Sequence, residues 1–406
     1  MAQHPVNLDD IRRAQSTLKG RIQSTETRVC PWDPNLYFKF ENEQLTGSFK
    51  IRGALNCMLN LSEAERAHGV VASSAGNHAQ GVALSAQITG MKAHIVMPIT
   101  APLVKVNATR SYGANVILHG EFYDEAYAHA LELEKQHRYT FVHPYLDPRV
   151  IAGQGTIGLE LLEAIADLEA VVVPIGGGGL LSGIATAVKS LKPSIKVYGV
   201  VSDTSPAMMQ LFHSKGAAQI SPVPARIRRA TIAEGIAVKN ASPDMHKHYI
   251  SRLVDDVVSV SDDEIATAIV ALMEKSKAVV EGSGAAGVAA IMAGKLPQLQ
   301  GRKTAVILCG GNIDLNVIAR VIERGLRSAS RLARVSVIAD DLPGNLLRLT
   351  EVMAKNRANV LEVLHDRVSP ELGLRETRID LLVETLNAEQ IGEIKSQLAA
   401  LGFKVR

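Results

Sequence analysis

The sequence predicts an α/β fold followed by a smaller α/β domain at the C-terminal end. Two observations support this prediction. From Asn35 onward, short β-rich runs alternate with longer helical patterns, and near Ala329 this alternation gives way to a different order of elements. Regular alternation of strand and helix favours a parallel sheet that is covered by helices on both faces. Ligands of such sheets bind beyond the carboxyl ends of the strands.

The expected elements follow one another in a regular order up to about residue 311. The runs expected as strands are NLYFKFE (35–41), GVVASS (69–74), AHIVMP (93–98), ANVILHG (114–120), YTFVHP (139–144), AVVVPIGGGG (170–179), KVYGVVS (196–202) and TAVILCGG (304–311). Helices are expected from about Ser48, from Asn77, and over 121–136, 155–166 and 180–189. The loops at the strand ends that matter most are SSAGNH (73–78), PIGGGG (174–179) and CGGN (309–312).

The C-terminal segment has the order βαββαβ, which is that of ferredoxin-like domains. Its expected strands are 333–341, 358–368, 374–384 and 403–406, and its expected helices follow LPGN (342–345) and cover 387–402. We therefore expect a main domain over 1–330, with a smaller subdomain over about 45–150 and a larger one formed by the rest. A second domain is expected over 331–406.

Composition and charge exclude several classes of partner. The net charge is only +3, and no basic run is interleaved with aromatic residues, so no nucleic-acid partner is expected. The apolar run 170–188 contains Pro174 and four successive glycines, so it is not expected to span a membrane. No export signal is expected from the N-terminal residues, and the three cysteines have no disulfide or zinc spacing. These features favour the reducing cytoplasm.

A run of four glycines, Gly176–Gly179, lies between an expected strand and an expected helix. Several backbone N–H groups and the positive helix end can converge there on one anion, and the absence of side chains allows close approach. The alternative is a simple tight turn, for which one glycine normally suffices. The dinucleotide pattern GxGxxG and the pattern GxxxxGK[ST] are both absent, so a single phosphate is expected.

Lys50 stands at the expected start of a helix in TGSFKIRGA (46–54), where a cation is slightly unfavourable. One lysine, one phosphate site and an alternating α/β pattern together point to pyridoxal 5′-phosphate, a cofactor that has both an aldehyde and a phosphomonoester. A lysine amine forms a Schiff base with this aldehyde. The alternative is an ordinary surface lysine on a helix.

Several motifs resemble those of the fold-type II pyridoxal-phosphate enzymes, and within them the threonine dehydratases (threonine ammonia-lyases) that carry a C-terminal ACT domain. In order, they are TGSFKIRGA, SSAGNHAQGVA, VIAGQGTIGLE, PIGGGGLLSG, TIAEGIAV, VVEGSGAAGVAA and LCGGNID. The segment DDLPGNLLRLTEVMAKNRANV resembles an ACT domain. The resemblance implies a tryptophan synthase β-like fold with two open, twisted α/β subdomains.

The resemblance also implies roles for individual residues. Lys50 would form the Schiff base, Phe49 would flank the cofactor ring and Asn77 would bind the ring hydroxyl. The loop residues Ser74, Ala75, Gly76, Asn77 and His78 would receive the substrate carboxylate. The N–H groups of Gly176, Gly177, Gly178, Gly179 and Leu180 would hold the phosphate, Gly235 and Glu281 would lie near the ring, and Cys309 would face the pyridine nitrogen.

Each of these residues also has a purely structural interpretation. Asn77 and Ser74 are good helix-capping residues, and Cys309 is a residue type that is often buried in a core. His78 and Glu281 are also compatible with structural side chains whose polar groups are satisfied within the fold.

The implied reaction is the dehydration and deamination of L-threonine to 2-oxobutanoate and ammonia, and of L-serine to pyruvate. A hydroxyaspartate dehydratase of the same fold is an alternative. A serine racemase is disfavoured because racemases carry a serine where this chain has Ala75. Racemases also resemble one another in a segment that binds divalent metal, where this chain has only Asp203, so no metal site is expected. The non-enzymatic alternative is an inactive amino-acid sensor.

One segment departs from the family pattern: STETRVCPWDPNLYFKFE (24–41) is shorter than its usual counterpart, which leaves substrate access open. In the ACT-like region, the loop 341–345, with Asp341, Gly344 and Asn345, is expected to bind an amino-acid or nucleotide effector next to a neighbouring ACT unit. A homodimer or homotetramer is therefore expected. The alternative is a purely structural dimerisation module.

Overall fold

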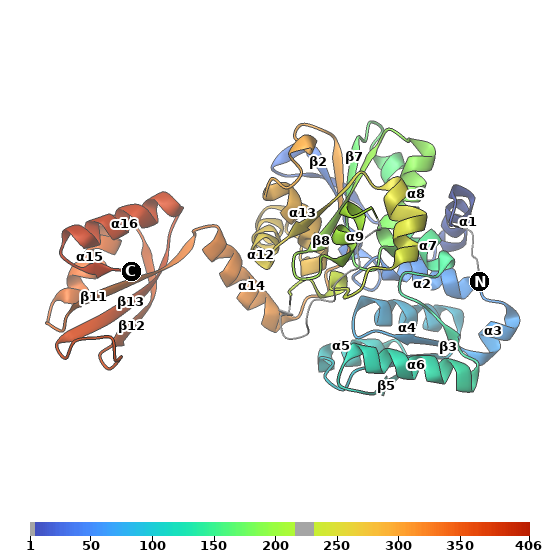
Figure 1. Cartoon of the computed structure of the whole chain (residues 1–406), viewed down its shortest axis with the longest axis horizontal. Coiled ribbons are helices and arrows are strands. Elements are labelled where there is room, and N and C mark those ends of the chain that lie inside the picture. The colour runs from blue at the N-terminus through green and yellow to red at the C-terminus, as the bar shows by residue number, and fades with distance from the viewer. Residues whose placement is uncertain (1–4, 216–230) are drawn as a thin grey trace. The chain divides into compact units, whose positions relative to one another are not determined.

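The computed structural model describes residues 5–215 and 231–406, which divide into two compact units, Met1–Leu315 and Asn316–Arg406 (Figure 1). The first unit contains two sheets and the second contains one. The helix α14 (Leu315–Ser328) is grouped with the second unit. The two units divide at the N-terminal end of α14, between Leu315 and Asn316. The boundary expected near residue 330 lies instead at the C-terminal end of this helix.

The larger sheet of the first unit has six strands in the order β1-β2-β10-β7-β8-β9. They are β1 (Thr27–Cys30), β2 (Asp33–Lys39), β7 (Ala170–Pro174), β8 (Lys196–Ser202), β9 (Asp256–Val260) and β10 (Thr304–Ile307). All neighbours are parallel except β1 and β2. The central strand β7 is buried at every residue, as its continuous apolar sequence AVVVP requires.

Two strands of this sheet, β1 and β9, are not among the strands expected from the sequence. Both lie at an edge of the sheet. The sequence of β1 is TRVC, and two of its four residues are exposed. The sequence of β9 is DVVSV, which is short and has mixed burial. Edge strands like these have a weak sequence pattern because only part of each strand is buried.

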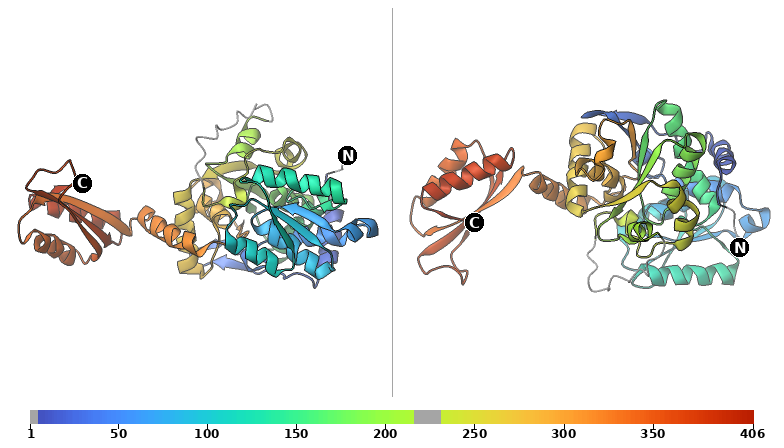
Figure 2. Two further views of the ribbon diagram at one scale, coloured as in Figure 1. Left: turned by 90° about the horizontal axis from the view of Figure 1, so that it is seen from below. Right: turned by 45° about the horizontal axis from the view of Figure 1, so that its top comes forward.

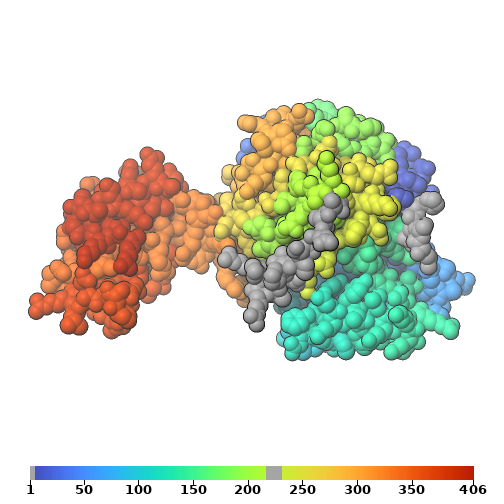
Figure 3. Space-filling view, viewed as in Figure 1, coloured from blue at the N-terminus to red at the C-terminus, as the bar shows by residue number. Residues whose placement is uncertain are grey.

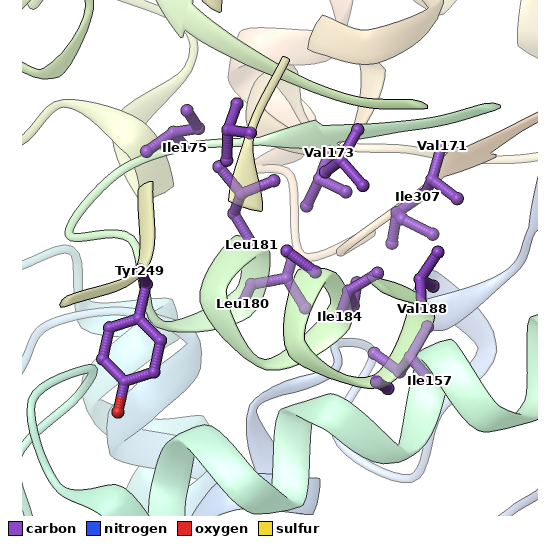
Figure 4. Packing of buried hydrophobic residues seen from close by; sticks show 14 of the residues in the cluster. Ile157, Val171, Val173, Ile175, Leu180, Leu181, Ile184, Val188, Tyr249 and Ile307 are labelled. Carbon is purple, nitrogen blue, oxygen red and sulfur yellow. The ribbon is translucent and has the colours of Figure 1, made fainter. Parts of the chain in front are cut away.

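Helices cover both faces of the six-stranded sheet (Figure 1). On one face lie α1 (Leu8–Leu18), α7 (Pro148–Ala164) and α8 (Gly179–Leu191), and on the other lie α12 (Asp262–Ala271) and α13 (Gly282–Met292). Figure 4 shows Ile184 and Val188 of α8 and Ile157 of α7 packed against Val171 and Val173 of β7. The intervening residue Val172 faces α13, in agreement with the two-residue period of a strand.

The smaller sheet has four parallel strands in the order β5-β4-β3-β6. They are β3 (Val70–Ser73), β4 (Ala93–Met97), β5 (Asn115–Leu118) and β6 (Thr140–Phe141). Its helices are α2 (Lys50–Leu59), α3 (Glu63–His68), α4 (Asn77–Thr89), α5 (Leu103–Ser111) and α6 (Tyr123–His137). In Figure 2 (left), the teal helix α6 lies along this sheet. In Figure 3, the teal residues of this subdomain form the lower part of the first unit's surface.

Short helical segments complete the first unit. They are α9 (Ala207–His213), α10 (Pro243–Met245) and α11 (Ser251–Leu253), the 3-10 turns η1 (Glu41–Glu43), η3 (Glu234–Ile236) and η6 (Pro297–Leu299), and the π-helical turns η4 (His246–Ile250) and η5 (Leu272–Ser276).

The second unit has the order of strands and helices expected from the sequence. After α14 come β11 (Leu332–Asp340), α15 (Asn345–Lys355), β12 (Asn359–Asp366), β13 (Glu376–Glu384), α16 (Ala388–Ala400) and β14 (Lys404–Val405). The sheet is antiparallel with the order β12-β13-β11-β14. Alternate residues of β13, such as Ile379 and Leu381, pack with Leu349 of α15 and Leu398 of α16.

Within 5–215 and 231–406, every helix is too short or too polar to cross a bilayer. The same ranges contain no cluster of three or more His, Cys, Asp or Glu side chains that could bind a metal ion.

Candidate active site

Lys50 is the first residue of α2, two positions after the helix start expected near Ser48, and its side chain points toward a loop from another part of the chain. Its Nζ donates a hydrogen bond to the backbone oxygen of Pro144, at 3.2 Å, and lies 5.0 Å from the ring centre of Phe49. The helix is held in place by very close backbone packing. A Cβ on Gly81 of α4 would lie 3.1 Å from the Lys50 carbonyl carbon, and a Cβ on Gly153 of α7 would lie 2.5 Å from a backbone oxygen of α2.

The loop that precedes Lys50 is docked on the loop that follows β10. The N–H of Phe49 donates to the oxygen of Cys309 (3.2 Å), and the N–H of Gly311 donates to the oxygen of Gly47 (2.9 Å). The segment TGSF is therefore fixed by backbone bonds on the larger sheet, while the helix it starts packs in the smaller subdomain. Lys50 therefore lies at the junction of the two subdomains.

The surroundings of Lys50 favour its neutral form. Burial lowers the pKa of Lys50 to about 8, and the nearby Cys309 and Glu281 only partly oppose this effect. Burial, together with the charge of Lys50, also lowers the pKa of His143 to about 4 and that of His78 to about 3, so both rings are neutral at physiological pH. A lysine with this pKa is about one-tenth neutral at pH 7, and this fraction can act as a base.

Asn77 connects the two subdomains through its side chain. It is the first residue of α4, and its Nδ2 donates to Oε1 of Glu281, which precedes α13, at 2.8 Å. The N-cap of α4 is Gly76, without any side-chain cap, so Asn77 does not cap this helix. Ser74 accepts a hydrogen bond at Oγ from the N–H of Gly76 (3.1 Å) within the strand-to-helix turn.

Glu281 and Cys309 both lie close enough to Lys50 to affect its charge. Burial raises the pKa of Glu281 to about 7, although the donated hydrogen bond from Asn77 works in the opposite direction. Burial also raises the pKa of the Cys309 thiol far above physiological pH, with a further contribution from Glu281. Cys309 is therefore a neutral thiol, and Glu281 changes charge near neutral pH.

The side chain of His78, the residue that follows Asn77, is buried. Its Nε2 donates to the backbone oxygen of Val142 at 2.8 Å, which leaves Nδ1 as an acceptor. No donor for this Nδ1 is present within the described ranges of the chain. The ring therefore has no N–H left to offer to an anion.

The glycine loop between β7 and α8 is closely surrounded. A Cβ on Gly177 would lie 2.3 Å from the ring of Tyr145, and one on Gly179 would lie 2.9 Å from the Tyr145 Cα. Gly178 has φ +96°, a conformation that glycine adopts readily. A Cβ on Gly176 would lie 3.0 Å from the oxygen of Gly235. Side chains are thus excluded along the whole loop.

The loop can hold an anion. Among the residues that the structure describes, none accepts a hydrogen bond from the N–H of Gly176, Gly177 or Gly178. The first N–H groups of α8, which include that of Leu180, have no partner within the helix. No acidic residue lies in the first turn of α8, so its positive end is uncompensated. These features suit a phosphate group.

The glycine loop and Lys50 are connected through the segment that contains Pro144 and Tyr145. Pro144, which accepts the hydrogen bond from Lys50, directly precedes Tyr145, whose ring lies against Gly177. On the other side, a Cβ on Gly235 would lie 3.5 Å from Oε1 of Glu281. The donor set, an amine and a phosphate cradle joined through a few contacts, therefore fits a cofactor that carries an aldehyde and a phosphate.

The residues expected to bind an effector lie in the second unit. Asp341 accepts a hydrogen bond at Oδ2 from Arg367 (2.9 Å), and Asn345 donates from Nδ2 to the oxygen of Asp340 (2.7 Å). Gly344 caps α15 with φ +92°. The polar groups of this loop are thus engaged locally.

Several residues at the site are not among those expected from the sequence. Pro144 and Tyr145 lie in HPYLDP, between two recognised segments, and Asn312 lies in LCGGNID without an assigned role. The Nδ2 of Asn312 donates to the oxygen of Thr46 (2.7 Å) and to Oδ1 of Asn77 (2.8 Å). The position of Asn312 in a motif of the resemblance is the signal that could have identified it.

A buried ion network supports the helix that carries Lys50. The fully buried Arg52 donates to both carboxylate oxygens of Glu41, at 2.8 Å each, and to Glu160 of α7. Lys39 of β2 also pairs with Glu160. Two cations and two carboxylates thus balance inside the protein and join β2, α2 and α7.

The chain is similar to several known proteins in sequence and in structure. Residues 28–310 match the model of the family described as pyridoxal-phosphate dependent enzyme. The chain is 46% identical to L-threonine ammonia-lyase of Thermotoga maritima over 99% of both chains. Among solved structures, it is similar to threonine deaminase isoform 2 of Solanum lycopersicum (TM-score 0.71, 34% identity, 79% of this chain and 90% of that chain). It is also similar to maize serine racemase (TM-score 0.72, 32% identity, 80% of this chain and 99% of that chain).

Proposed function

Because the chain belongs to the family of pyridoxal-phosphate dependent enzymes, we propose that it eliminates water from L-threonine, and that hydrolysis of the resulting imine then releases 2-oxobutanoate and ammonia. L-Serine would give pyruvate by the same reaction. The observation that carries this proposal is a set of contacts: Lys50 reaches the glycine loop through Pro144 and Tyr145, and Asn77 bonds to Glu281. The similarity to an L-threonine ammonia-lyase over nearly the whole chain supports the choice of substrate.

Lys50 both attaches the cofactor and moves the α-proton in this proposal. When bound, pyridoxal phosphate withdraws electrons from the α-carbon of an amino acid that is joined to its aldehyde carbon. The amine of Lys50, freed by the incoming amino acid, removes the α-proton. Its pKa of about 8 makes this possible near neutral pH, because about one-tenth of the amine is unprotonated at pH 7, far more than for an ordinary lysine.

The remaining residues would hold the cofactor. The N–H groups of Gly176–Gly179 and Leu180 would bind the phosphate, and Phe49 and Gly235 would flank the ring. Asn77 would bind the ring hydroxyl with the Nδ2 hydrogen that it does not give to Glu281. Cys309 would face the pyridine nitrogen. As a neutral thiol it would not hold that nitrogen protonated, which would limit the electron withdrawal that the cofactor supplies.

The carboxylate of the substrate would bind at the start of α4. Its donors would be the hydroxyl of Ser74 and the free N–H groups of the first turn, at the positive end of a helix of 13 residues. His78 lies beside this loop, but its Nε2–H is engaged by Val142, so it would shape the loop rather than donate to the anion.

Ala75 distinguishes this proposal from racemisation, which the similarity to serine racemase makes the main alternative. A racemase needs an acid on the face of the substrate opposite the lysine. The methyl group of Ala75 occupies the loop position that the resemblance gives to that acid, and a methyl group cannot donate a proton.

The test is to supply L-threonine, L-serine and 3-hydroxyaspartate separately and to measure ammonia and the keto acid. We expect fast release of 2-oxobutanoate from L-threonine, and none from a Lys50→Ala variant. Circular dichroism of the remaining L-serine tests racemisation in the same reaction. Formation of D-serine in excess of pyruvate, or full activity of Lys50→Ala, would contradict the proposal.

We propose further that the βαββαβ unit is an ACT domain that binds an amino acid or a nucleotide at Asp341, Gly344 and Asn345. The expected assembly is a cytoplasmic homodimer or homotetramer, with the catalytic domain over 1–330, its smaller subdomain over about 45–150, and the regulatory domain over 331–406. The test is to add branched-chain amino acids or adenine nucleotides and compare the threonine kinetics of the full-length protein with those of Asp341→Ala. Identical kinetics under every condition would oppose regulation.

A further inference from the structure

The side-chain amide of Asn312 is fully used as a donor. Its Nδ2 carries two hydrogens, and it donates to two acceptors, the oxygen of Thr46 at 2.7 Å and Oδ1 of Asn77 at 2.8 Å. Thr46 begins the loop that leads to Lys50, and Asn77 begins α4. The amide of Asn312, which follows β10 of the larger sheet, therefore bonds both to the loop before Lys50 and to the start of α4.

The donated hydrogen bond from Asn312 decides which way the Asn77 amide points. Because Oδ1 of Asn77 accepts from Asn312, its Nδ2 is directed at Oε1 of Glu281, at 2.8 Å. In the reverse orientation, Nδ2 of Asn77 would face Nδ2 of Asn312, so that two donors would meet. Oδ1 of Asn77 would face Oε1 of Glu281, so that two acceptors would meet. Both new contacts would be unfavourable.

The position of Asn312 is itself restricted. Gly47 has φ +67°, and a Cβ there would lie only 2.5 Å from Oδ1 of Asn312. The neighbouring Gly311 donates its N–H to the oxygen of Gly47 at 2.9 Å. The amide of Asn312 therefore lies tightly against the backbone of the loop, which limits its rotation.

We propose that Asn312 is a positioning residue that fixes the orientation of the Asn77 amide, so that Asn77 offers its hydrogens to Glu281 and to the ring of the cofactor. The inference rests on the proposed function, because it assigns Asn312 to the same site. Asn312 acts through Asn77 and does not take part in the chemistry.

Loss of Asn312 should change the titration of Glu281, which a merely structural role of Asn312 would not do. A hydrogen bond donated to a carboxylate favours its charged form. If the Asn77 amide is free to turn its oxygen toward Glu281, this donor is lost, and the turned amide can instead accept a hydrogen bond from the protonated carboxyl. Loss of Asn312 should therefore move the titration of Glu281 to higher pH.

The test compares Asn312→Ala and Asn312→Asp with Asn42→Ala. Asn42 is a matched control, because its Nδ2 donates to the oxygen of Val279 at 3.2 Å and does not contact Asn77. Each protein is loaded with pyridoxal phosphate, and the absorbance of the bound cofactor is recorded between about pH 6 and about pH 9. The kcat and KM for L-threonine and the melting temperature are measured on the same samples.

We expect the Asn312 variants to keep the cofactor and to melt close to Asn42→Ala. Their spectral midpoint should move to higher pH, and kcat should fall about tenfold, a loss equal to that of one hydrogen bond. Asn312→Asp should be worse than Asn312→Ala, because an acceptor replaces the donor that faces Asn77. Spectra and pH profiles equal to those of Asn42→Ala would overturn the inference.

A double-mutant cycle separates positioning from an independent effect. In the background of Asn77→Ala, removal of Asn312 should leave the pH of the spectral midpoint unchanged and should change kcat by less than about twofold. Full additivity would overturn the inference. The spectral titration does not require threonine turnover, so a protein that binds cofactor but releases no ammonia would contradict the proposed function while still testing Asn312.

Discussion

The side-chain amide of Asn77 donates a hydrogen bond to the carboxyl group of Glu281, at 2.8 Å, across 204 positions of the sequence. This contact links the start of α4, in the four-stranded subdomain, to the start of α13, which covers the six-stranded sheet. Polar groups from both subdomains thus converge at the point where Lys50 emerges. The chemistry that the chain can perform depends on this junction.

Replacement of Glu281 by Gln should change how stability depends on pH. Burial raises the pKa of this acid from its usual 4.5 to about 7, so the folded state prefers the protonated form. Relative to Glu281→Gln, the native protein should lose stability as pH rises from about 4.5 to about 7. The loss should be at most about 3.5 kcal/mol, at about 1.4 kcal/mol per pH unit.

Urea denaturation of the cofactor-free proteins at several pH values measures this difference. Glu26→Gln is the control, since Glu26 is an exposed partner of Arg28. A stability difference between the native protein and Glu281→Gln that does not change with pH would contradict the assignment.

Replacement of Arg52 by Met should destabilise the protein strongly. It would leave Glu41 fully buried without its bidentate partner and would remove one of the two cations that bind Glu160. Breaking a buried pair on one side costs about 3–5 kcal/mol. Arg28→Met, which breaks exposed pairs with Glu26 and Glu43, should cost less than about 1 kcal/mol. Chemical denaturation measures both, and equal effects of the two substitutions would show that the network does not hold α2.

Replacement of Gly177 by Ala should weaken cofactor binding. The added methyl group would lie 2.3 Å from the ring of Tyr145, so the ring or the loop has to move. We expect at least about a tenfold loss of affinity for pyridoxal phosphate, about 1.4 kcal/mol, in an absorbance titration. The matched control is Gly392→Ala on α16, where a Cβ meets no atom within 4 Å. Unchanged affinity of Gly177→Ala for pyridoxal phosphate would contradict the proposal that the glycine loop binds the cofactor.

Local patterns were sufficient to predict much of this arrangement. The strand–glycine–helix sequence of Gly176–Gly179 and the position of Lys50 at a helix start are properties of short stretches, and both were predicted from the sequence. The order βαββαβ of the second unit follows equally from alternating patterns. The edge strands β1 and β9 were missed because few of their residues are buried.

The residues missed at the site depend on contacts between distant parts of the chain. Asn312 and Asn77 are 235 positions apart, and Arg52 and Glu160 are 108 apart. No period or spacing reveals that such residues will meet. A polar residue in a recognised motif indicates importance, but only the arrangement of the two sheets shows that Asn312 reaches Asn77 and that Tyr145 lies against Gly177.

The most direct measurement of the central claim is the identification of the lysine that bonds to the cofactor. The full-length protein is incubated with pyridoxal phosphate, reduced with borohydride, digested and analysed by mass spectrometry. We expect one stoichiometric pyridoxyl group, on Lys50, and none at that level in Lys50→Ala. A stoichiometric label on a different lysine, or no label on Lys50 in the presence of excess cofactor, would contradict the account.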